Sequence, residues 1–352
     1  MNGRSVEGGV GIAIFGAGAF GQALAAAALQ SGHAPTMFAP READLAMARR
    51  NGALASARFV AMETAQGYWR GRSEDGDPSD PGVAWPELVV MAVPTQALRA
   101  AAGWLQSNAP DGARFAVVIA SKGVEQGSLL LPHDIVRSVL RAEAAIAALS
   151  GPSFAREIVQ GMATSVVCAS EDQSFVRRCA RLLHRPNFRI YGSRDIIGVE
   201  VGGALKNVVA MAAGAADGLG LGNNGRAAVI TRGLGEITQV GVAMGADPMT
   251  FLGLSGLGDL VLTCTGDLSR NRTFGYRLAK GESPQAIMAA LGEVVEGYST
   301  AQSAYELSQK LGTDTPIIDA VHDVLYAGVS VAAAFETLAR RDQKEEFEWL
   351  RS

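Results

Sequence analysis

A glycine motif near the N-terminus constrains the fold of this chain more than any other feature. Residues 16–21 read Gly-Ala-Gly-Ala-Phe-Gly, which is a G-x-G-x-x-G pattern. The motif directly follows the apolar run Val10–Phe15 and opens the alanine-rich segment Ala19–Gln30, which stops at Ser31-Gly32. Alone the pattern is a weak signal, but between a buried strand and a helix it is typical of a dinucleotide-binding turn. The motif therefore predicts a nucleotide site at this strand end.

Each glycine of the motif has its own steric role. Gly16 permits the tight turn, Gly18 lets the backbone approach a pyrophosphate, and Gly21 allows the helix to pack closely on the strand. The helix N-terminus adds unpaired N–H groups and the positive end of its dipole. The alternative is a glycine turn that only packs, and the strand–turn–helix context favours binding. Ala19 and Phe20 complete the candidate cofactor contacts within the motif.

Segments typical of strands and helices alternate through the first half of the chain. Further strands are predicted at Pro35–Ala39, Glu87–Val93, Arg114–Ser121, Ala144–Leu149, Thr164–Ala169 and Phe188–Tyr191. Helices are predicted at Glu42–Arg50, Gln96–Gln106 and Phe175–His184. This alternation predicts an α/β fold with a Rossmann-type, doubly wound parallel sheet. In such a sheet the loops that follow the strands lie at one edge, where ligands bind.

The character of the sequence changes after about Arg194. Small residues dominate, β-branched runs shorten, and Val199–Ala216 and Ala227–Met244 are predicted to be long helices. The length of 352 residues also favours two domains. We therefore expect a dinucleotide-binding domain over residues 1–194 and an all-helical substrate domain over residues 195–352.

Composition and charge argue against several classes of protein. The chain has 31 Lys and Arg against 35 Asp and Glu, a formal charge of −4, so it lacks the basic surface of a nucleic-acid binder. Uninterrupted apolar runs fall short of the roughly 20 residues of a membrane span, and the N-terminus lacks the apolar core of a signal peptide. Three cysteines without a C-x-x-C pair indicate a reduced, cytoplasmic protein, and four scattered histidines predict no metal site.

Lys206 and Asn207 interrupt a helix that is otherwise apolar. Every other residue of Ala204–Ala216 is apolar or glycine. A helix that is apolar on all sides is buried, and a buried lysine is rare unless it is paired or functional. Burial lowers the pKa of an ammonium group toward neutrality, where it can transfer a proton. The alternative is a lysine that extends its ammonium to the surface, and the pattern allows both.

Further polar candidates occur in loops and in a glycine-rich segment. Lys122 follows a predicted strand at the expected ligand edge, where it could bind an anion or be a solvated loop lysine. The segment Gly253–Asn271 contains Asp259 and ends in Ser269-Arg270-Asn271, whose guanidinium and amide donors suit a phosphate. The same trio could equally be a helix cap with a surface arginine. Val294–Gly297 resembles a helix end.

Several motifs, taken in order, resemble those of bacterial NAD(P)-dependent glycerol-3-phosphate dehydrogenases. The matching stretches are Gly16–Gly21, Ser121–Gly123, Gly151–Ala155, Gly203–Asn207, Gly256–Leu260 and Ser269–Arg272. The match runs from about Val10 to Ala327 and so covers nearly the whole chain. Asn51–Trp85 departs from the family pattern, because the expected leucine-proline-glycine loop is missing and the polar stretch Gly71–Gly82, predicted as a surface loop, stands there. We assign no binding role to that region.

The resemblance implies the reversible reaction between dihydroxyacetone phosphate and sn-glycerol 3-phosphate, which supplies the backbone of phospholipids. It implies that Lys206 binds substrate and transfers the proton, and that Lys122 contacts both ligands. The other implied substrate contacts are Gly151, Ser153, Asp259, Ser269, Arg270 and Asn271. The implied cofactor contacts outside the glycine motif are Lys122, Ala155, Arg270, Val294 and Glu296. The resemblance also implies a homodimer.

The choice between NAD and NADP is expected to depend on a residue about 20 positions after the glycine motif. Counting from Gly21 reaches Arg41, and an arginine there can pair with the 2′-phosphate of NADP. Glu42 competes for the role if the helix boundary is shifted, because a carboxylate binds the ribose of NAD. Both residues could also be solvated at a helix start. We expect NADPH to be preferred and NADH to be accepted.

Two other functions are compatible with the sequence. A related two-domain dehydrogenase could act on another small anion such as a 3-hydroxy acid, although the Ser-Arg-Asn trio favours a phosphate. A nucleotide-sensing module could bind the cofactor without turnover, but it would not need a proton donor at Lys206.

Overall fold

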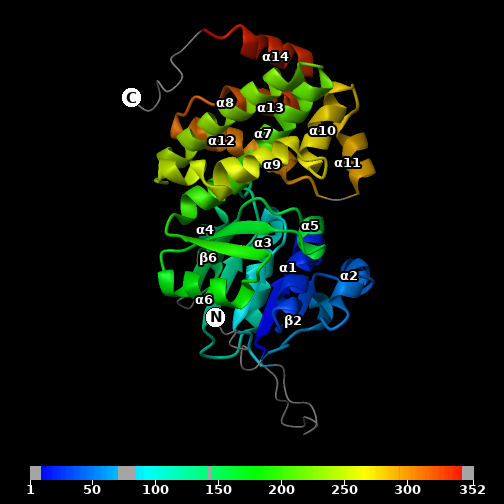
Figure 1. The fold of residues 1–352 in the computed structure, drawn as a ribbon, viewed down its shortest axis with the longest axis vertical. Coiled ribbons are helices and arrows are strands. Elements are labelled where there is room, and N and C mark those ends of the chain that lie inside the picture. Colours follow the sequence, from blue (N-terminus) through cyan, green and yellow to red (C-terminus); the bar gives the residue numbers. More distant parts are fainter. Residues whose placement is uncertain (1–8, 70–83, 141–143, 293, 343–352) are drawn as a thin grey trace. The chain divides into compact units, whose positions relative to one another are not determined.

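The computed structural model describes residues 9–69, 84–140, 144–292 and 294–342. The polar stretch Gly71–Gly82 lies outside the described residues. The chain divides into two compact units. Figure 1 shows their helices and strands, coloured by residue number from the N-terminus (blue) to the C-terminus (red). Unit 1 comprises Met1–Ser121, Pro132–Leu149 and Ser153–Ile196. Unit 2 comprises Lys122–Leu131, Ser150–Pro152 and Ile197–Ser352.

Unit 1 is built on a sheet whose described strands follow the order β3-β2-β1-β4-β5-β6-β7-β8. Their bounds are β1 Gly11–Phe15, β2 Ala34–Ala39, β3 Arg58–Ala61, β4 Leu88–Met91, β5 Phe115–Ile119, β6 Ala144–Ser150, β7 Thr164–Ala169 and β8 Phe188–Ser193. The pairs β1–β2, β1–β4, β2–β3, β4–β5, β5–β6 and β7–β8 are parallel. The predicted α/β class is confirmed. The sequence analysis missed β3, a four-residue edge strand that is too short to show a periodic pattern.

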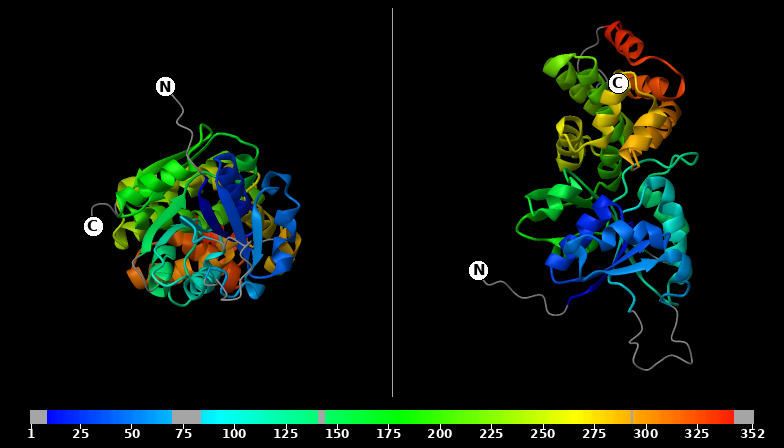
Figure 2. Two further views of the ribbon diagram at one scale, coloured as in Figure 1. Left: turned by 90° about the horizontal axis from the view of Figure 1, so that it is seen from below. Right: turned by 90° about the vertical axis from the view of Figure 1, so that its right-hand side faces the viewer.

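Helices of unit 1 cover both faces of this sheet. They are α1 (Ala19–Gln30), α2 (Glu42–Arg49), α3 (Thr95–Asn108), α4 (Pro132–Val139), α5 (Ala155–Val159) and α6 (Gln173–Leu183). Ile12 and Ile14 of β1 share a core with Leu24 of α1, whereas the Phe15 ring contacts the Trp104 ring of α3. Because successive strand residues point to opposite faces, α1 and α3 lie on opposite sides of the sheet. This doubly wound arrangement can be followed in Figure 2.

Unit 2 is helical from Ile197 onward in the part of the chain that the structure describes. Its α-helices are α7 (Ile196–Gly218), α8 (Gly222–Ala243), α9 (Asp259–Thr265), α10 (Arg270–Ala279), α11 (Pro284–Leu291), α12 (Glu296–Leu311), α13 (Pro316–Tyr326) and α14 (Val331–Ala339). Val124 and Leu131, which follow β5 in the chain, belong to the same core as α7. The segment Lys122–Leu131 is therefore anchored in unit 2.

Helix α7 is the central packing element of unit 2. By length and composition it could cross a membrane, but 94% of its most apolar window is buried inside the protein, as expected of a core helix. Glycines bring α10 close to it. A Cβ on Gly214 would lie 1.9 Å from the carbonyl oxygen of Arg272, and a Cβ on Gly275 would lie 1.9 Å from that of Met211. The small residues of this part of the sequence therefore allow backbone-to-backbone packing of α7 and α10.

Candidate active site

The glycine motif forms the turn between β1 and α1. Gly16 has a φ of +113°, and a Cβ there would lie 2.3 Å from the carbonyl oxygen of Ala92. A Cβ on Gly21 would lie 2.0 Å from the carbonyl oxygen of Gly16, so the helix packs directly on the turn. Gly18 is the N-cap of α1, and nothing lies within 4 Å of its Cβ position. The three glycines thus have the geometry that a closely approaching pyrophosphate requires.

The motif also lies where the strand order of the sheet reverses. Strand β1 has β2 on one side and β4 on the other. Ligands of open parallel sheets bind at the carboxyl ends of the strands at such a point. Ala19 and Phe20 begin α1, whose first turn carries no acidic side chain that would repel an anion. The residues at this turn fit the phosphates of a dinucleotide cofactor.

Arg41 lies just after β2, where counting from the glycine motif predicts it. It is the N-cap of α2, and its exposed side chain donates to the Asp44 carboxylate through Nε at 3.1 Å and through Nη2 at 2.9 Å. Glu42 is the first residue of α2 and forms an ion pair with Arg49. The helix boundary is therefore the expected one, but Asp44 partly offsets the charge of Arg41. The sequence analysis missed this pair, although its i, i+3 spacing signals it.

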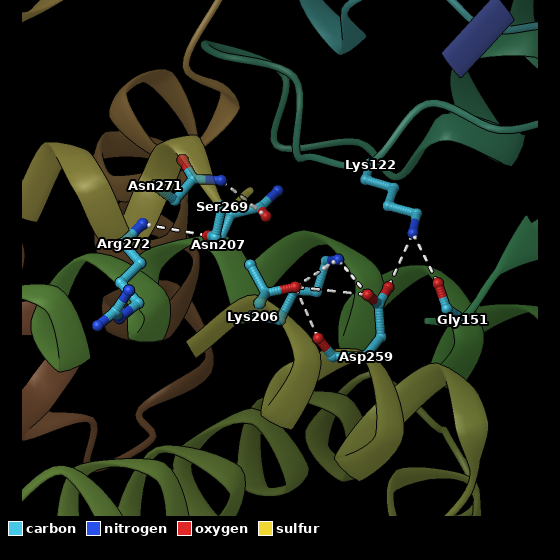
Figure 3. Close-up of polar contacts among 9 residues, drawn as sticks. Lys122, Gly151, Lys206, Asn207, Asp259, Ser269, Asn271 and Arg272 are labelled. Carbon is cyan, nitrogen blue, oxygen red and sulfur yellow. Dashed lines mark hydrogen bonds and ion pairs between the residues drawn. The ribbon is translucent and has the colours of Figure 1, made fainter. Parts of the chain in front are cut away.

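A buried carboxylate in unit 2 binds both candidate lysines (Figure 3). Asp259, only 1% exposed, accepts a hydrogen bond from Nζ of Lys122 at 2.8 Å and another from Nζ of Lys206. Lys206 also donates to Oγ1 of Thr263 at 2.9 Å, and Lys122 donates to the carbonyl oxygen of Gly151 at 3.3 Å. The side chains of Lys122 and Lys206 are 16% and 9% exposed. The alternatives of a solvated or surface-reaching lysine are therefore wrong.

Local backbone structure explains how these side chains meet. Leu254–Gly258 forms a π-helical turn, which places Asp259 at the start of α9; such turns are frequent at functional sites. Gly151 has a φ of +136°, a conformation that favours glycine. Gly203 on α7 leaves space for the neighbouring segments, because a Cβ there would lie 2.7 Å from Oγ of Ser150 and 3.6 Å from the Lys122 side chain. Gly151 and Gly203 thus allow helix α7, the segment around Ser150 and the segment around Lys122 to approach one another closely.

The electrostatics of the cluster adjust Lys206 for proton transfer. Burial lowers the pKa of Lys206 to about 8; the charge of Asp259 opposes this shift and that of Lys122 adds to it. Burial alone would raise the pKa of Asp259, but the charges of Lys122 and Lys206 hold it below its usual value. At neutral pH Asp259 is therefore ionised, and Lys206 is mostly protonated but close to releasing its proton. Such a group can act as a general acid or base.

Thr263 is a site residue that the sequence analysis did not single out. It lies four residues after Asp259 on α9, and its hydroxyl donates to the Asp259 carbonyl oxygen at 2.6 Å while accepting from Lys206. Residues at i and i+4 share a face of a helix. The spacing from Asp259 was therefore the signal that could have found it.

The predicted phosphate-binding trio lies at the start of α10. Ser269 is the N-cap, and its hydroxyl accepts from the N–H of Arg272 at 3.2 Å. Arg270 is the first helical residue, and it is exposed. The helix-cap interpretation is therefore correct for the local structure. It is compatible with anion binding, because the cap leaves a basic side chain at the positive end of a helix.

Asn271 connects the trio to the helix that carries Lys206. Its Nδ2 donates to Oδ1 of Asn207 at 3.0 Å, and its Oδ1 accepts from the N–H of Gly297 at 3.1 Å. Gly297 is the second residue of α12, which begins at Glu296, so the stretch interpreted as a helix end is a helix start. Val294 is exposed just before it. The candidate contacts Val294, Glu296 and Asn271 thus lie along one connected part of unit 2.

The structure divides the candidate residues between the units. Unit 1 carries Gly16, Gly18, Ala19, Phe20, Gly21, Arg41, Ser153 and Ala155. Unit 2 carries Lys122, Gly151, Lys206, Asp259, Ser269, Arg270, Asn271, Val294 and Glu296. Ala155 is the first residue of α5, and Ser153 lies two positions before it.

Comparison with known proteins identifies the family. Residues 80–176 match the family described as NAD-dependent glycerol-3-phosphate dehydrogenase N-terminus, and residues 195–336 match the corresponding C-terminus. A protein of Dechloromonas aromatica (strain RCB) named glycerol-3-phosphate dehydrogenase (NAD(P)+) is 45% identical over 335 residues, which cover 95% of this chain and 99% of that protein. This chain belongs to the NAD-dependent glycerol-3-phosphate dehydrogenase family.

Further relatives agree with this assignment. A protein of the same name from Ralstonia nicotianae (strain ATCC BAA-1114 / GMI1000) is 44% identical over 339 residues, covering 95% of this chain and 98% of its own. The crystal structure of glycerol-3-phosphate dehydrogenase from Coxiella burnetii matches with a TM-score of 0.83 at 30% identity, covering 95% of this chain and 99% of that one.

Family membership confirms the resemblance found in the motifs. The chain is an oxidoreductase that uses NAD or NADP, with a Rossmann-type unit followed by a helical unit. The alternative of a nucleotide-sensing module without turnover is therefore set aside. The N-terminal family match begins at residue 80, so it does not include the glycine motif or most of the divergent stretch Asn51–Trp85.

Proposed function

We propose that this enzyme reversibly reduces dihydroxyacetone phosphate to sn-glycerol 3-phosphate, with Lys206 transferring the proton. The observation that carries the proposal is the buried cluster of Lys122, Asp259 and Lys206, together with the basic start of α10 in the same unit. The cluster suits a carbonyl oxygen, and the helix start suits a phosphate. Family membership supports this choice of substrate.

The lysine cluster provides the proton and the positive charge that the reduction needs. When bound, the nicotinamide cofactor supplies the hydride for C2 of the substrate. The ammonium of Lys206 donates a proton to the carbonyl oxygen and so yields the secondary alcohol; in the oxidation the amine takes a proton back. Lys122 stabilises negative charge that develops on the same oxygen. Asp259 keeps both ammonium groups in place.

The start of α10 provides the anion-binding end. Arg270 lies in its first turn, which has no acidic side chain, and the helix dipole adds positive potential there. The guanidinium of Arg270 is suited to paired hydrogen bonds with a phosphate. Ser269 and Asn271 flank it as further donors. Binding energy from the phosphate then holds the reacting carbon in position.

The remaining candidate residues complete the proposal. The glycine motif of unit 1 binds the pyrophosphate of the cofactor, with Ala155, Lys122, Arg270, Val294 and Glu296 as further contacts. Gly151 and Ser153 bind substrate. Residues 1–194 then form the cofactor domain, except for Lys122–Leu131 and Ser150–Pro152. Those two segments form the substrate domain together with residues 195–352.

Cofactor oxidation tests the reaction directly. The full-length enzyme is mixed with NADPH or NADH, and absorbance of the reduced cofactor is followed after dihydroxyacetone phosphate is added. We expect one cofactor to be oxidised per sn-glycerol 3-phosphate formed. Turnover with a 3-oxo acid and none with dihydroxyacetone phosphate would instead support the related hydroxy-acid dehydrogenase.

Replacing Arg270 with alanine is expected to raise the KM for dihydroxyacetone phosphate at least about tenfold, because a charge-assisted phosphate contact is lost. The unphosphorylated analogue dihydroxyacetone should be affected much less. Steady-state kinetics with both substrates measures this difference. Arg277→Ala is the matched control, since Arg277 lies in the last turn of the same helix and pairs with Glu282. Equal losses for both substrates would indicate a structural role for Arg270.

Cofactor preference is expected to depend on Arg41 and its partner Asp44. We propose that NADPH is preferred, with NADH accepted, because an exposed Arg41 can pair with a 2′-phosphate. Arg41→Ala should lower the ratio of kcat/KM for NADPH to that for NADH. Asp44→Asn should raise the ratio, because it removes the carboxylate that competes for Arg41. A wild-type preference for NADH, or no change in either variant, would rule out Arg41 as the selecting residue.

We further propose that the enzyme acts in the cytoplasm as a homodimer and supplies the glycerol backbone of phospholipids. Cys168, Cys179 and Cys264 are buried free thiols in the described chain, which suits a reducing compartment. The homodimer follows from the family resemblance alone. Light scattering on the purified enzyme measures its mass in solution and so tests the dimer.

A further inference from the structure

Asp217, near the C-terminal end of α7, accepts hydrogen bonds from two arginines. Its Oδ2 accepts from Nε of Arg272 at 3.0 Å and from Nη2 at 2.9 Å, and its Oδ1 accepts from Nη1 of Arg226 at 2.9 Å. The side chains of Asp217 and Arg272 are 12% and 22% exposed. Water and salt screen such a shielded ion pair less than an exposed one. The pair can therefore determine where the two side chains lie.

The placement of these charges opposes both helix dipoles. A carboxylate in the last turn of α7 faces the negative end of that helix, and a guanidinium in the first turn of α10 faces the positive end of the other. Each charge alone would destabilise its helix. The ion pair between Asp217 and Arg272 offsets the unfavourable interaction of each charge with its own helix dipole and connects the end of α7 to the start of α10.

The same turn of α7 also contacts the backbone of Arg272. Gly214 lies three residues before Asp217, and its backbone approaches the Arg272 carbonyl so closely that a Cβ would lie 1.9 Å from the oxygen. The N–H of Arg272 donates to Ser269. Arg272 thus donates from its guanidinium to Asp217 and from its N–H to Ser269, and its carbonyl packs against Gly214. Arg270 and Asn271 lie between Ser269 and Arg272 in the chain, so the hydrogen bond between those two residues encloses them.

We propose that Asp217 is a positioning residue for the phosphate of the substrate. By holding Arg272 against α7, it fixes the direction of the first turn of α10 and with it Arg270 and Asn271. Asp217 itself does not touch the substrate, and the guanidinium of Arg272 is committed to Asp217. The inference rests on the proposed function of this turn.

The test replaces each of two aspartates that pair with Arg272, Asp217 and Asp267, with asparagine. Asp217→Asn keeps the shape of the side chain but removes its charge, and we expect the KM for dihydroxyacetone phosphate to rise about tenfold, as for a lost charged hydrogen-bonded pair. The kcat and the kcat/KM for unphosphorylated dihydroxyacetone should stay near their wild-type values. Asp267→Asn is the control. Asp267 accepts from Nη1 of Arg272 at 3.2 Å but is 98% exposed, so its loss should leave KM unchanged.

Arg272→Lys tests the pair from the other side, because lysine keeps the charge but cannot donate from two nitrogens of a planar group. Its KM should rise as in Asp217→Asn, and the double variant should be no worse than the more affected single variant. An unchanged or lower KM for dihydroxyacetone phosphate in Asp217→Asn overturns the inference. An equal loss of kcat/KM for dihydroxyacetone phosphate and for dihydroxyacetone also overturns it, because it indicates a structural role. Absence of wild-type turnover overturns the proposed function and this inference together. Normal wild-type turnover with an unaffected Asp217→Asn overturns the inference alone.

Discussion

Replacing Lys206 with alanine is expected to lower turnover of dihydroxyacetone phosphate by roughly 100-fold or more, the usual contribution of a positioned acid–base group. The expected loss is large because Lys206 is buried, hydrogen-bonded to Asp259 and Thr263, and has its pKa lowered to about 8 by burial. Stopped-flow or steady-state kinetics measures the loss. Binding of NADPH, followed by fluorescence titration, should stay near the wild-type value, because the glycine motif belongs to unit 1.

Lys310→Ala is the matched control for this experiment, since Lys310 is exposed in the last turn of α12. Its turnover should equal that of the wild type. A Lys206→Ala variant that keeps more than half of wild-type turnover would contradict the assigned proton transfer. A folded variant that no longer binds NADPH would show that Lys206 acts on the cofactor instead.

Replacing Asp259 with asparagine is expected both to destabilise the enzyme and to shift its pH dependence. The substitution leaves the ammonium groups of Lys122 and Lys206 without their shared buried carboxylate, and breaking such a pair costs about 3–5 kcal/mol. Because Asp259 opposes the lowering of the pKa of Lys206, its loss lowers that pKa further. Thermal unfolding measures the first effect, and rate profiles between about pH 6 and 10 measure the second.

The direction of the pH effect follows from the protonation state that each reaction needs. Reduction needs the ammonium of Lys206, so its rate falls as the pH rises through about 8; oxidation needs the amine, so its rate rises over the same range. In Asp259→Asn the pH midpoint of the reduction rate and that of the oxidation rate should both move to lower pH. Asp267→Asn, which changes an exposed carboxylate, should leave them in place. Transitions that stay fixed or move to higher pH in Asp259→Asn would contradict the role of Asp259.

Local sequence patterns were sufficient to predict the glycine turn and every described strand of the unit 1 sheet except β3. The spacing of the three glycines between an apolar run and an alanine-rich helix was the local signal of the turn. The turn itself also depends on a distant segment, because a Cβ on Gly16 would lie 2.3 Å from the carbonyl oxygen of Ala92. The sequence also placed Lys206 in an otherwise apolar helix, but it left open whether the ammonium is buried or extends to the surface. The short edge strand Arg58–Ala61 was missed because four residues show no reliable period.

The sequence by itself therefore determined the fold class, the glycine turn and a lysine in an apolar helix, because each is visible as a local pattern of residue types. Only the tertiary structure decided which charges meet. Asp259 is separated from Lys122 by 137 positions and from Lys206 by 53, and Asp217 from Arg272 by 55. Lys122 joins unit 2 because Val124 and Leu131 pack into its core. Such pairings depend on how helices pack in space, and no local pattern encodes them.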